Sequence, residues 1–431
     1  MQPSLLQGRL PIVGARKRNL KSTKSGSASA AMLCLFGAAA VAKGQSVVMP
    51  PPSYSVTPPA VQSELGGQIG EGTNPALPDF ANLLQWGPVT IHPHASYQLL
   101  YADGLQSAPG QQQSSVVQTL SPGVFLNIGT HWTLDYSPTI TFYSSSQLHD
   151  TVNQTMSLSW GTFYEDWSWG FSQGLNIADN PLVQTATQTS TESYNTSLTA
   201  SHRFNSVMSL DMSLSQSINS ADQFSSSKSW NTMEYLNYQL FPRMDAALGV
   251  GFGYDAVSLG PDMSHETVQA RLSWSVANKT GLVVHGGVED LQYLGGGVPE
   301  TITPVFGVSL QYQAFSHTSI SLNADRSISP ALFASQAAQT TTLGVSLGQR
   351  FLQHFNFSVS GSYGLTDYLS SSAGVAAGRS DSYYSISSQL SWAFLKRATV
   401  SLTDQYSVNN SNANGFGFSS TQVGIMVGYG F

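Results

Sequence analysis

The last eleven residues of the chain, 421–431, alternate between large apolar side chains and small or polar ones. The apolar parity includes the final residue and consists of Val423, Ile425, Val427, Tyr429 and Phe431. Alternation with a period of two indicates a β-strand with two unlike faces. In water, a sheet edge that exposes these side chains together would promote aggregation. The segment is therefore predicted to be a strand whose apolar face contacts lipid.

The same alternation recurs throughout residues 88–431. Clear examples are 132–142, 208–215, 248–255, 306–312, 343–347, 355–359 and 384–392. Each predicted strand has about eleven residues, which at roughly 3.4 Å per residue and a tilt near 45° spans about 25 Å, the height of the apolar band of an outer-membrane barrel. These segments are predicted to cross a membrane as strands.

Composition supports this interpretation. Only 10% of the residues are charged, whereas soluble domains have about 25%. After the N-terminal segment no run of 18 apolar residues occurs, so membrane-spanning helices are not expected. A chain poor in charge but rich in Ser, Thr, Asn, Gln, Gly and aromatic residues is typical of a barrel with lipid outside and water inside.

Predicted tight turns, most of them preceded by an aromatic residue, follow one another at intervals of 35 to 43 residues. They lie at Thr130, Glu165, Phe204, Phe241, Asn278, Phe315, Phe351 and Phe394. One hairpin per interval gives eighteen strands, with sixteen as the alternative. The turns are predicted to be periplasmic, and the longer connections between them extracellular. The predicted fold is an all-β, transmembrane, antiparallel up-and-down barrel.

The C-terminal segment resembles the closing strand of Gram-negative outer-membrane β-barrels, in which a terminal aromatic residue follows alternating hydrophobic residues. The resemblance implies that the barrel-assembly machinery recognises this segment and that outer-membrane lipid surrounds the barrel. The chain is similar to porins in architecture only. It has no obviously long inward-folding loop and no dense ladder of Arg opposite acidic residues.

The N-terminal region is predicted to direct export. Basic residues from Arg16 to Lys24 precede the small and apolar run 28–41, the layout of a secretory signal peptide over residues 1–42. A membrane anchor is the alternative, but the run is shorter than the roughly 20 residues that span a bilayer. Residues 43–87 are rich in Pro and are predicted to be a periplasmic linker, with a plug inside the barrel as the alternative.

Removing the predicted signal leaves an acidic chain without cysteine. Six of the 17 Lys and Arg and none of the 24 acidic residues precede residue 43, so the remainder carries 11 − 24 = −13. This charge disfavours nucleic acid as a partner. Cys34, the only cysteine, lies within the predicted signal. A disulfide framework is therefore not expected.

Assigning the apolar parity to lipid directs most strand charges into the lumen. The candidate lumen-lining residues are His92, His94, Asp135, Arg203, Asp211, Asp245, Asp255, Arg271, Glu289, Asp325 and Arg350. Asp404 and Glu234 fall on the lipid parity and are expected near strand ends. The inward charges would either tune the selectivity of a pore or simply solvate the lumen and pair with each other.

The sequence favours a passive channel over an enzyme. No acid pair, nucleophile elbow or phosphate loop is present, and His92 and His94 have no identifiable third metal ligand. No catalytic, cofactor or metal-binding residue is therefore predicted. Sixteen to eighteen strands enclose a space too wide for side chains to fill, so passive diffusion of small polar solutes is predicted. The alternatives are a structural or surface-display barrel with a blocked lumen and, less favoured, a barrel-embedded hydrolase.

Overall fold

The computed structural model describes residues 84–277, 279–294, 300–315, 317–334, 336–352, 354–370, 378–395 and 397–430. The predicted signal peptide, residues 43–83 of the predicted linker and Phe431 lie outside this part of the chain. None of the described segments forms a helix of the length and apolarity that a bilayer crossing requires.

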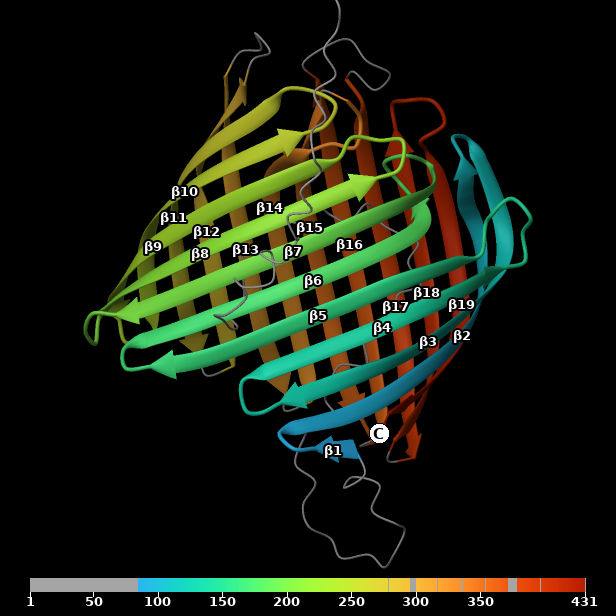
Figure 1. Cartoon of the computed structure of the whole chain (residues 1–431), viewed down its shortest axis with the longest axis horizontal. Helices are drawn as coiled ribbons and strands as arrows, with labels where there is room; N and C mark the ends of the chain where they lie inside the picture. Colours follow the sequence, from blue (N-terminus) through green and yellow to red (C-terminus); the bar gives the residue numbers. More distant parts are fainter. Residues whose placement is uncertain are drawn as a thin grey trace, which may run out of the picture. The chain divides into compact units, whose positions relative to one another are not determined.

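The described residues form one closed antiparallel barrel (Figure 1). Eighteen long strands follow the two-residue strand β1, each pairs with its neighbours in sequence, and β19 closes the ring by pairing with β2. The bounds are β1 Gln85–Trp86, β2 Val89–Ala108, β3 Gln111–Ile128, β4 Trp132–Tyr143, β5 Thr151–Tyr164, β6 Trp167–Leu182, β7 Thr187–Arg203, β8 Met208–Ala221, β9 Ser227–Phe241, β10 Met244–Val257, β11 Asp262–Ala277, β12 Thr280–Leu294, β13 Thr301–Phe315, β14 Thr318–Pro330, β15 Gln336–Phe351, β16 Phe355–Ser370, β17 Ser380–Leu395, β18 Ala398–Ser411 and β19 Phe418–Gly430. The prediction of an eighteen-stranded up-and-down barrel is confirmed.

The two faces of the wall follow from strand register. Cα partners on adjacent strands share a face, so the exposed side chains of Val250, Val268 and Val288 form one apolar row across β10, β11 and β12. The closing seam continues this face, because Ile425 of β19 pairs with Leu99 of β2 and both are exposed. In an outer-membrane barrel this is the face that contacts lipid.

The strands are longer than the predicted eleven residues. Within β2–β19 they range from 12 residues in β4 to 20 in β2. The connection between the first two long strands is correspondingly short, because β2 continues to Ala108 and β3 begins at Gln111. Apolar alternation identifies only the part of a strand whose outer face is apolar. The ends of the strands that continue beyond this part are polar, so the sequence pattern did not reveal them.

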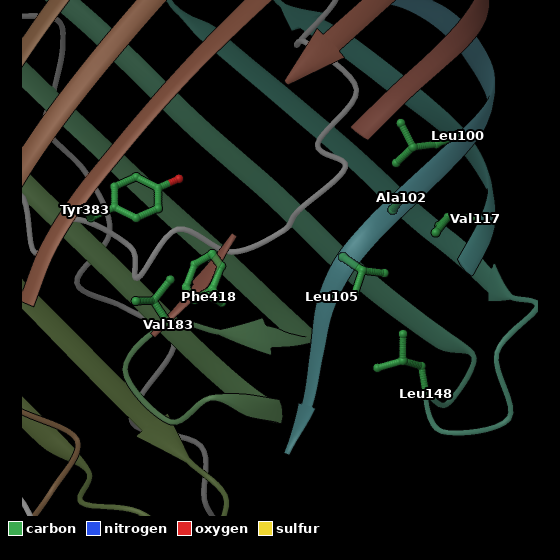
Figure 2. Packing of buried hydrophobic residues seen from close by; sticks show 8 residues of the cluster. All are labelled: Leu100, Ala102, Leu105, Val117, Leu148, Val183, Tyr383 and Phe418. Atoms are coloured by element: carbon green, nitrogen blue, oxygen red, sulfur yellow. The ribbon is translucent and has the colours of Figure 1, made fainter. Parts of the chain in front are cut away.

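A bulge changes the direction of β2 near its loop end. The β2–β3 register shifts between Ala102 and Leu105, and Gly104 there has a φ of +80°. A Cβ at Gly104 would collide with the carbonyl oxygen of Ser419, so glycine is required. The shift brings Leu105 into the same buried cluster as Leu100 and Ala102 (Figure 2).

Candidate functional site: the lumen and its loop-end mouth

The inner face of the wall is lined by paired hydroxyl groups. On β16–β18, Ser360 and Ser387 are 2.7 Å apart, Ser362 and Ser385 2.8 Å, and Ser391 and Ser401 2.8 Å (Oγ to Oγ). These groups satisfy one another and still offer lone pairs to water. This part of the wall is polar and uncharged.

The β14–β15 hairpin leaves the wall and folds inward at its tip. Pairing between β13 and β14 stops at Phe306 and Arg326, although β14 continues to Pro330. Beyond that point Ile328 packs in one buried cluster with Met263 of β11 and Leu291 of β12. Since β13 lies between β12 and β14 in the ring, this contact requires the tip of the hairpin to lie against the inner face of the wall.

The tip of β14–β15 also meets loops from other sides of the barrel. The backbone N–H of Ser225, in the β8–β9 loop, donates to the carbonyl of Leu332 over 2.7 Å. The Phe333 ring makes edge-on contacts with Phe224 at 5.8 Å and with Phe416, in the β18–β19 loop, at 6.2 Å between centroids. Three connections at the loop end of the barrel are thereby joined.

Arg379 links these loops to the β6–β7 turn. Its side chain is fully buried and lies just before β17. The guanidinium donates to the carboxylate of Asp381 and to the carbonyl oxygens of Gln184 (2.8 Å) and Val183 (3.2 Å) in the β6–β7 turn. Its central carbon lies 3.8 Å from the centroid of the Phe416 ring. One side chain thus ties β6–β7, β17 and β18–β19 together.

The β6–β7 turn reaches the opposite wall. Val183 belongs to a buried cluster with Leu100 of β2, Tyr383 of β17 and Phe418 of β19 (Figure 2). These strands are not neighbours of β6 or β7 in the ring. Thr187 Oγ1 also donates to the carbonyl of Ser107 in β2 over 3.2 Å. The loop-end mouth is therefore crossed by contacts between loops.

The convergence of these loops was not anticipated from the sequence. We found no long inward-folding loop in the sequence, but several short connections fold inward together. We name the group Val183, Phe224, Phe333, Arg379 and Phe416 the mouth cluster. Sequence reasoning missed Arg379 altogether. The available signals were an Arg two residues before an Asp at a strand start, and single phenylalanines in otherwise polar loops.

Strand register places the predicted lumen residues on the inner face. They are His92, His94, Asp135, Arg203, Asp211, Asp245, Asp255, Arg271, Glu289, Asp325 and Arg350. Arg203, Asp245 and Arg350 lie at the turn end of their strands. The other eight lie between the two ends or toward the loops.

One charged group on this face is an ion pair between strands that are not adjacent. Nη2 of Arg271 on β11 lies 2.7 Å from Oδ2 of Asp211 on β8 and also 2.7 Å from Oδ1 of Asn237 on β9. The guanidinium covers the Tyr235 ring at 4.0 Å. The positive charge of Arg271 is therefore already balanced.

Two histidines absent from our prediction lie among predicted carboxylates. His265 on β11 has Nε2 3.8 Å from Asp255 on β10 and Nδ1 3.7 Å from Glu289 on β12. His285 on β12 has Nε2 3.9 Å from Asp325 on β14. The His265 ring lies over Gly253 and the His285 ring over Gly307, where a Cβ would collide with them.

Neither His265 nor His94 is placed to activate a serine nucleophile. Both ring nitrogens of His265 face carboxylates. His94 Nε2 lies 3.1 Å from Ser137 Oγ, which donates to Asp135 over 3.1 Å. The serine is thus in the middle, whereas an activated serine needs the histidine between hydroxyl and carboxylate. Among the described residues no group of three His, Cys, Asp or Glu side chains is placed to hold a metal ion.

We expected the two carboxylates of the lipid parity to lie near strand ends. The structure instead places both in the middle of their strands. Asp404 pairs with Val423 inside β18, and Glu234 pairs with Val250 inside β9. Their register partners Val250 and Val423 are exposed on the outer face.

Charge is distributed unequally between the two ends of the barrel. Acidic residues dominate the loop end: Asp103, Asp150, Asp222, Asp262, Glu300 and Asp367. A hydrogen bond with Asp290, together with repulsion between the two carboxylates, raises the pKa of Glu300. Most described basic residues lie at the turn end: Arg203, Arg243, Lys279, Arg350 and Arg397.

Comparison with known proteins agrees with this architecture. The model of the family "Putative beta-barrel porin 2" matches residues 284–430, about a third of the chain and most of the second half of the barrel. The resemblance to porin-like outer-membrane barrels is thereby confirmed. The barrel and the family match together indicate an outer-membrane protein. No curated protein matches the chain.

Several solved structures are similar at low identity. OccAB2 of Acinetobacter baumannii has a TM-score of 0.45 and 10% identity, covering 79% of this chain and 98% of that one. OpdL of Pseudomonas aeruginosa has a TM-score of 0.43 and 12% identity, covering 80% and 99%. OccK3 (OpdO) of Pseudomonas aeruginosa has a TM-score of 0.41 and 13% identity, covering 79% and 95%. Similarity at this level says nothing about what a chain transports.

Proposed function

We propose that this protein is a porin-like channel through which small polar solutes diffuse passively across the outer membrane. The observation that carries the proposal is a closed ring of eighteen strands whose inner face is polar. A ring of this size is too wide for wall side chains to fill, so water occupies its lumen.

The path of a solute has two parts. At the loop end the solute passes the mouth cluster, where connections from β6–β7, β8–β9, β14–β15 and β18–β19 reduce the opening. Below the mouth it passes the inner wall, with hydroxyl groups on β16–β18 and charged groups on β8–β14. The mouth sets the size limit, and the charged wall acts on solutes that pass it.

The N-terminal segment and the last strand serve delivery to the membrane. A signal peptide over residues 1–42 directs export, and the barrel-assembly machinery recognises the closing strand with Val423, Ile425, Val427, Tyr429 and Phe431. Val423, Ile425, Val427 and Tyr429 are exposed on the outer face, which is compatible with contact to lipid. Residues 43–87 form a periplasmic linker.

The channel proposal is tested by electrical recording. The purified, folded full-length protein is added to a planar lipid bilayer in 1 M KCl, roughly the salt at which surface charges are screened within 3 Å. Discrete conductance steps are expected. Folding is verified beforehand on unheated and heated gels, because a closed barrel migrates differently before and after heating. A folded protein that gives no steps would show instead that the mouth cluster seals the lumen.

A further inference from the structure

We propose that the channel prefers cations and that Asp255, Glu289 and Asp325 set this preference. The inference rests on the channel function proposed above and assigns a class of solute to it. The three carboxylates come from β10, β12 and β14 and lie on the inner face. All three stand in the loop-end half of the barrel, just below the mouth.

The charge of these carboxylates is not cancelled by neighbouring basic residues. Among the described residues their partners within ion-pair distance are His265 and His285, at 3.7 to 3.9 Å, and two histidines can offset at most two of the three negative charges. No Lys or Arg of the described chain forms an ion pair with Asp255, Glu289 or Asp325. The three groups therefore leave an uncompensated negative charge on this wall.

Two arginines away from the turn end, Arg271 near the middle of β11 and Arg379 beside β17, are already paired. Arg271 is bound to Asp211 at 2.7 Å, and the buried Arg379 is bound to Asp381. Neither guanidinium is free to attract an anion into the lumen.

Thr303 adds a hydroxyl oxygen to this group of carboxylates. It is the Cα partner of Glu289 on the inner face, is only 8% exposed, and its Oγ1 has no hydrogen-bond partner among the described residues. A buried hydroxyl without a partner is costly unless water or a ligand satisfies it. Hydroxyl and carboxylate oxygens side by side suit a hydrated metal cation or an ammonium group.

The field of the whole barrel acts in the same direction. The loop end carries an excess of acidic residues, and most basic residues lie at the turn end. A channel mouth whose charges are mostly of one sign raises the local concentration of ions of the opposite charge. A cation approaching from outside is therefore attracted first to the loops and then to the wall below them.

The test measures zero-current potentials across a planar bilayer with unequal KCl on the two sides. The full-length protein, Asp255→Asn, Glu289→Gln, Asp325→Asn and the triple variant are compared. Wild type is expected to favour K⁺ over Cl⁻. Each substitution should lower the permeability ratio by about twofold, the effect of a unit charge about 8 Å from an ion in water.

Asp404→Asn is the matched control. It removes one carboxylate on the lipid parity, so the permeability ratio should not change. Folding of every variant is checked by heat-dependent gel migration. A conducting wild type that favours Cl⁻, or a folded triple variant with the wild-type ratio, would overturn the cation inference while leaving the channel intact. Absence of all conductance would instead overturn the channel function, and the inference with it.

Discussion

The guanidinium of Arg379 lies over the ring of Phe416, with 3.8 Å between its central carbon and the ring centroid. The ring covers a positive charge that is also bound to Asp381 and to two backbone carbonyls of the β6–β7 turn. A cation held against an aromatic face away from water gains about 2 kcal/mol. This relationship joins loops that start from distant strands.

Replacing Arg379 by Ala should loosen the mouth while the barrel remains closed. Asp381 would be left buried without its partner, which costs about 3 to 5 kcal/mol, and relaxation of the loops is the easiest way to rehydrate it. We expect a higher single-channel conductance and faster proteolysis within the loops. Arg379→Lys should give an intermediate result, because lysine loses the forked geometry. Arg243→Ala, at the opposite end, is the control; equal conductance in both alanine variants would contradict the assigned role.

A disulfide should form between Cys residues placed at 225 and 332. The Ser225 N–H donates to the Leu332 carbonyl at 2.7 Å, which implies Cα atoms roughly 5 to 6 Å apart, within the range of a disulfide. The double variant Ser225→Cys, Leu332→Cys is made with Cys34→Ser so that no other thiol is present. After oxidation, the denatured variant should migrate on a gel at a position that changes when a reductant is added. The cross-link should also lower the noise of the single-channel current, because the two loops can no longer move apart. The pair Ser225→Cys, Ser346→Cys should not cross-link; failure of the first pair to cross-link would refute contact between the loops.

Much of the barrel could be predicted because lipid imposes a pattern on each strand. The alternation of Leu248, Val250 and Phe252 with glycines gives both the strand and its register, and the turn spacing gives eighteen strands. The family resemblance of the last strand identified the membrane. The alternation pattern is local information, because the face of each residue is inferred from the residues two positions before and after it.

The mouth could not be predicted, because its contacts join residues far apart in sequence. Arg379 binds the carbonyls of Val183 and Gln184, nearly two hundred positions earlier, and backbone acceptors leave no trace in side-chain chemistry. His265 and His285 were missed for a similar reason. His265 becomes notable only once register places it between Asp255 and Glu289.

Gly253→Ala should disturb the histidine between those two carboxylates. A Cβ at this position would overlap the His265 ring and the side chain of Asn231, so the ring must move. Overpacking of this kind costs about 1 to 3 kcal/mol, and the temperature at which the heat-modifiable band shifts should fall. Gly281→Ala is a suitable comparison, because a Cβ there meets nothing within 4 Å. Equal transition temperatures for the two variants would indicate that the His265 ring does not occupy the space above Gly253.

Ile386 and Ser387 are adjacent on β17 and should respond in opposite ways to a positive charge. Ile386 is 53% exposed on the apolar face, whereas Ser387 Oγ lies 2.7 Å from Ser360 Oγ on the inner face. Ile386→Arg places a guanidinium in lipid at a cost of about 2 to 4 kcal/mol near the midplane, so the yield of folded, heat-modifiable protein in the outer membrane should drop. Ser387→Arg places the same group in the aqueous lumen, so assembly should continue, and the permeability ratio should shift toward anions. If Ser387→Arg were instead the variant that fails to assemble, the assignment of the two faces would be reversed, and with it the lumenal position of every charged residue on which the channel depends.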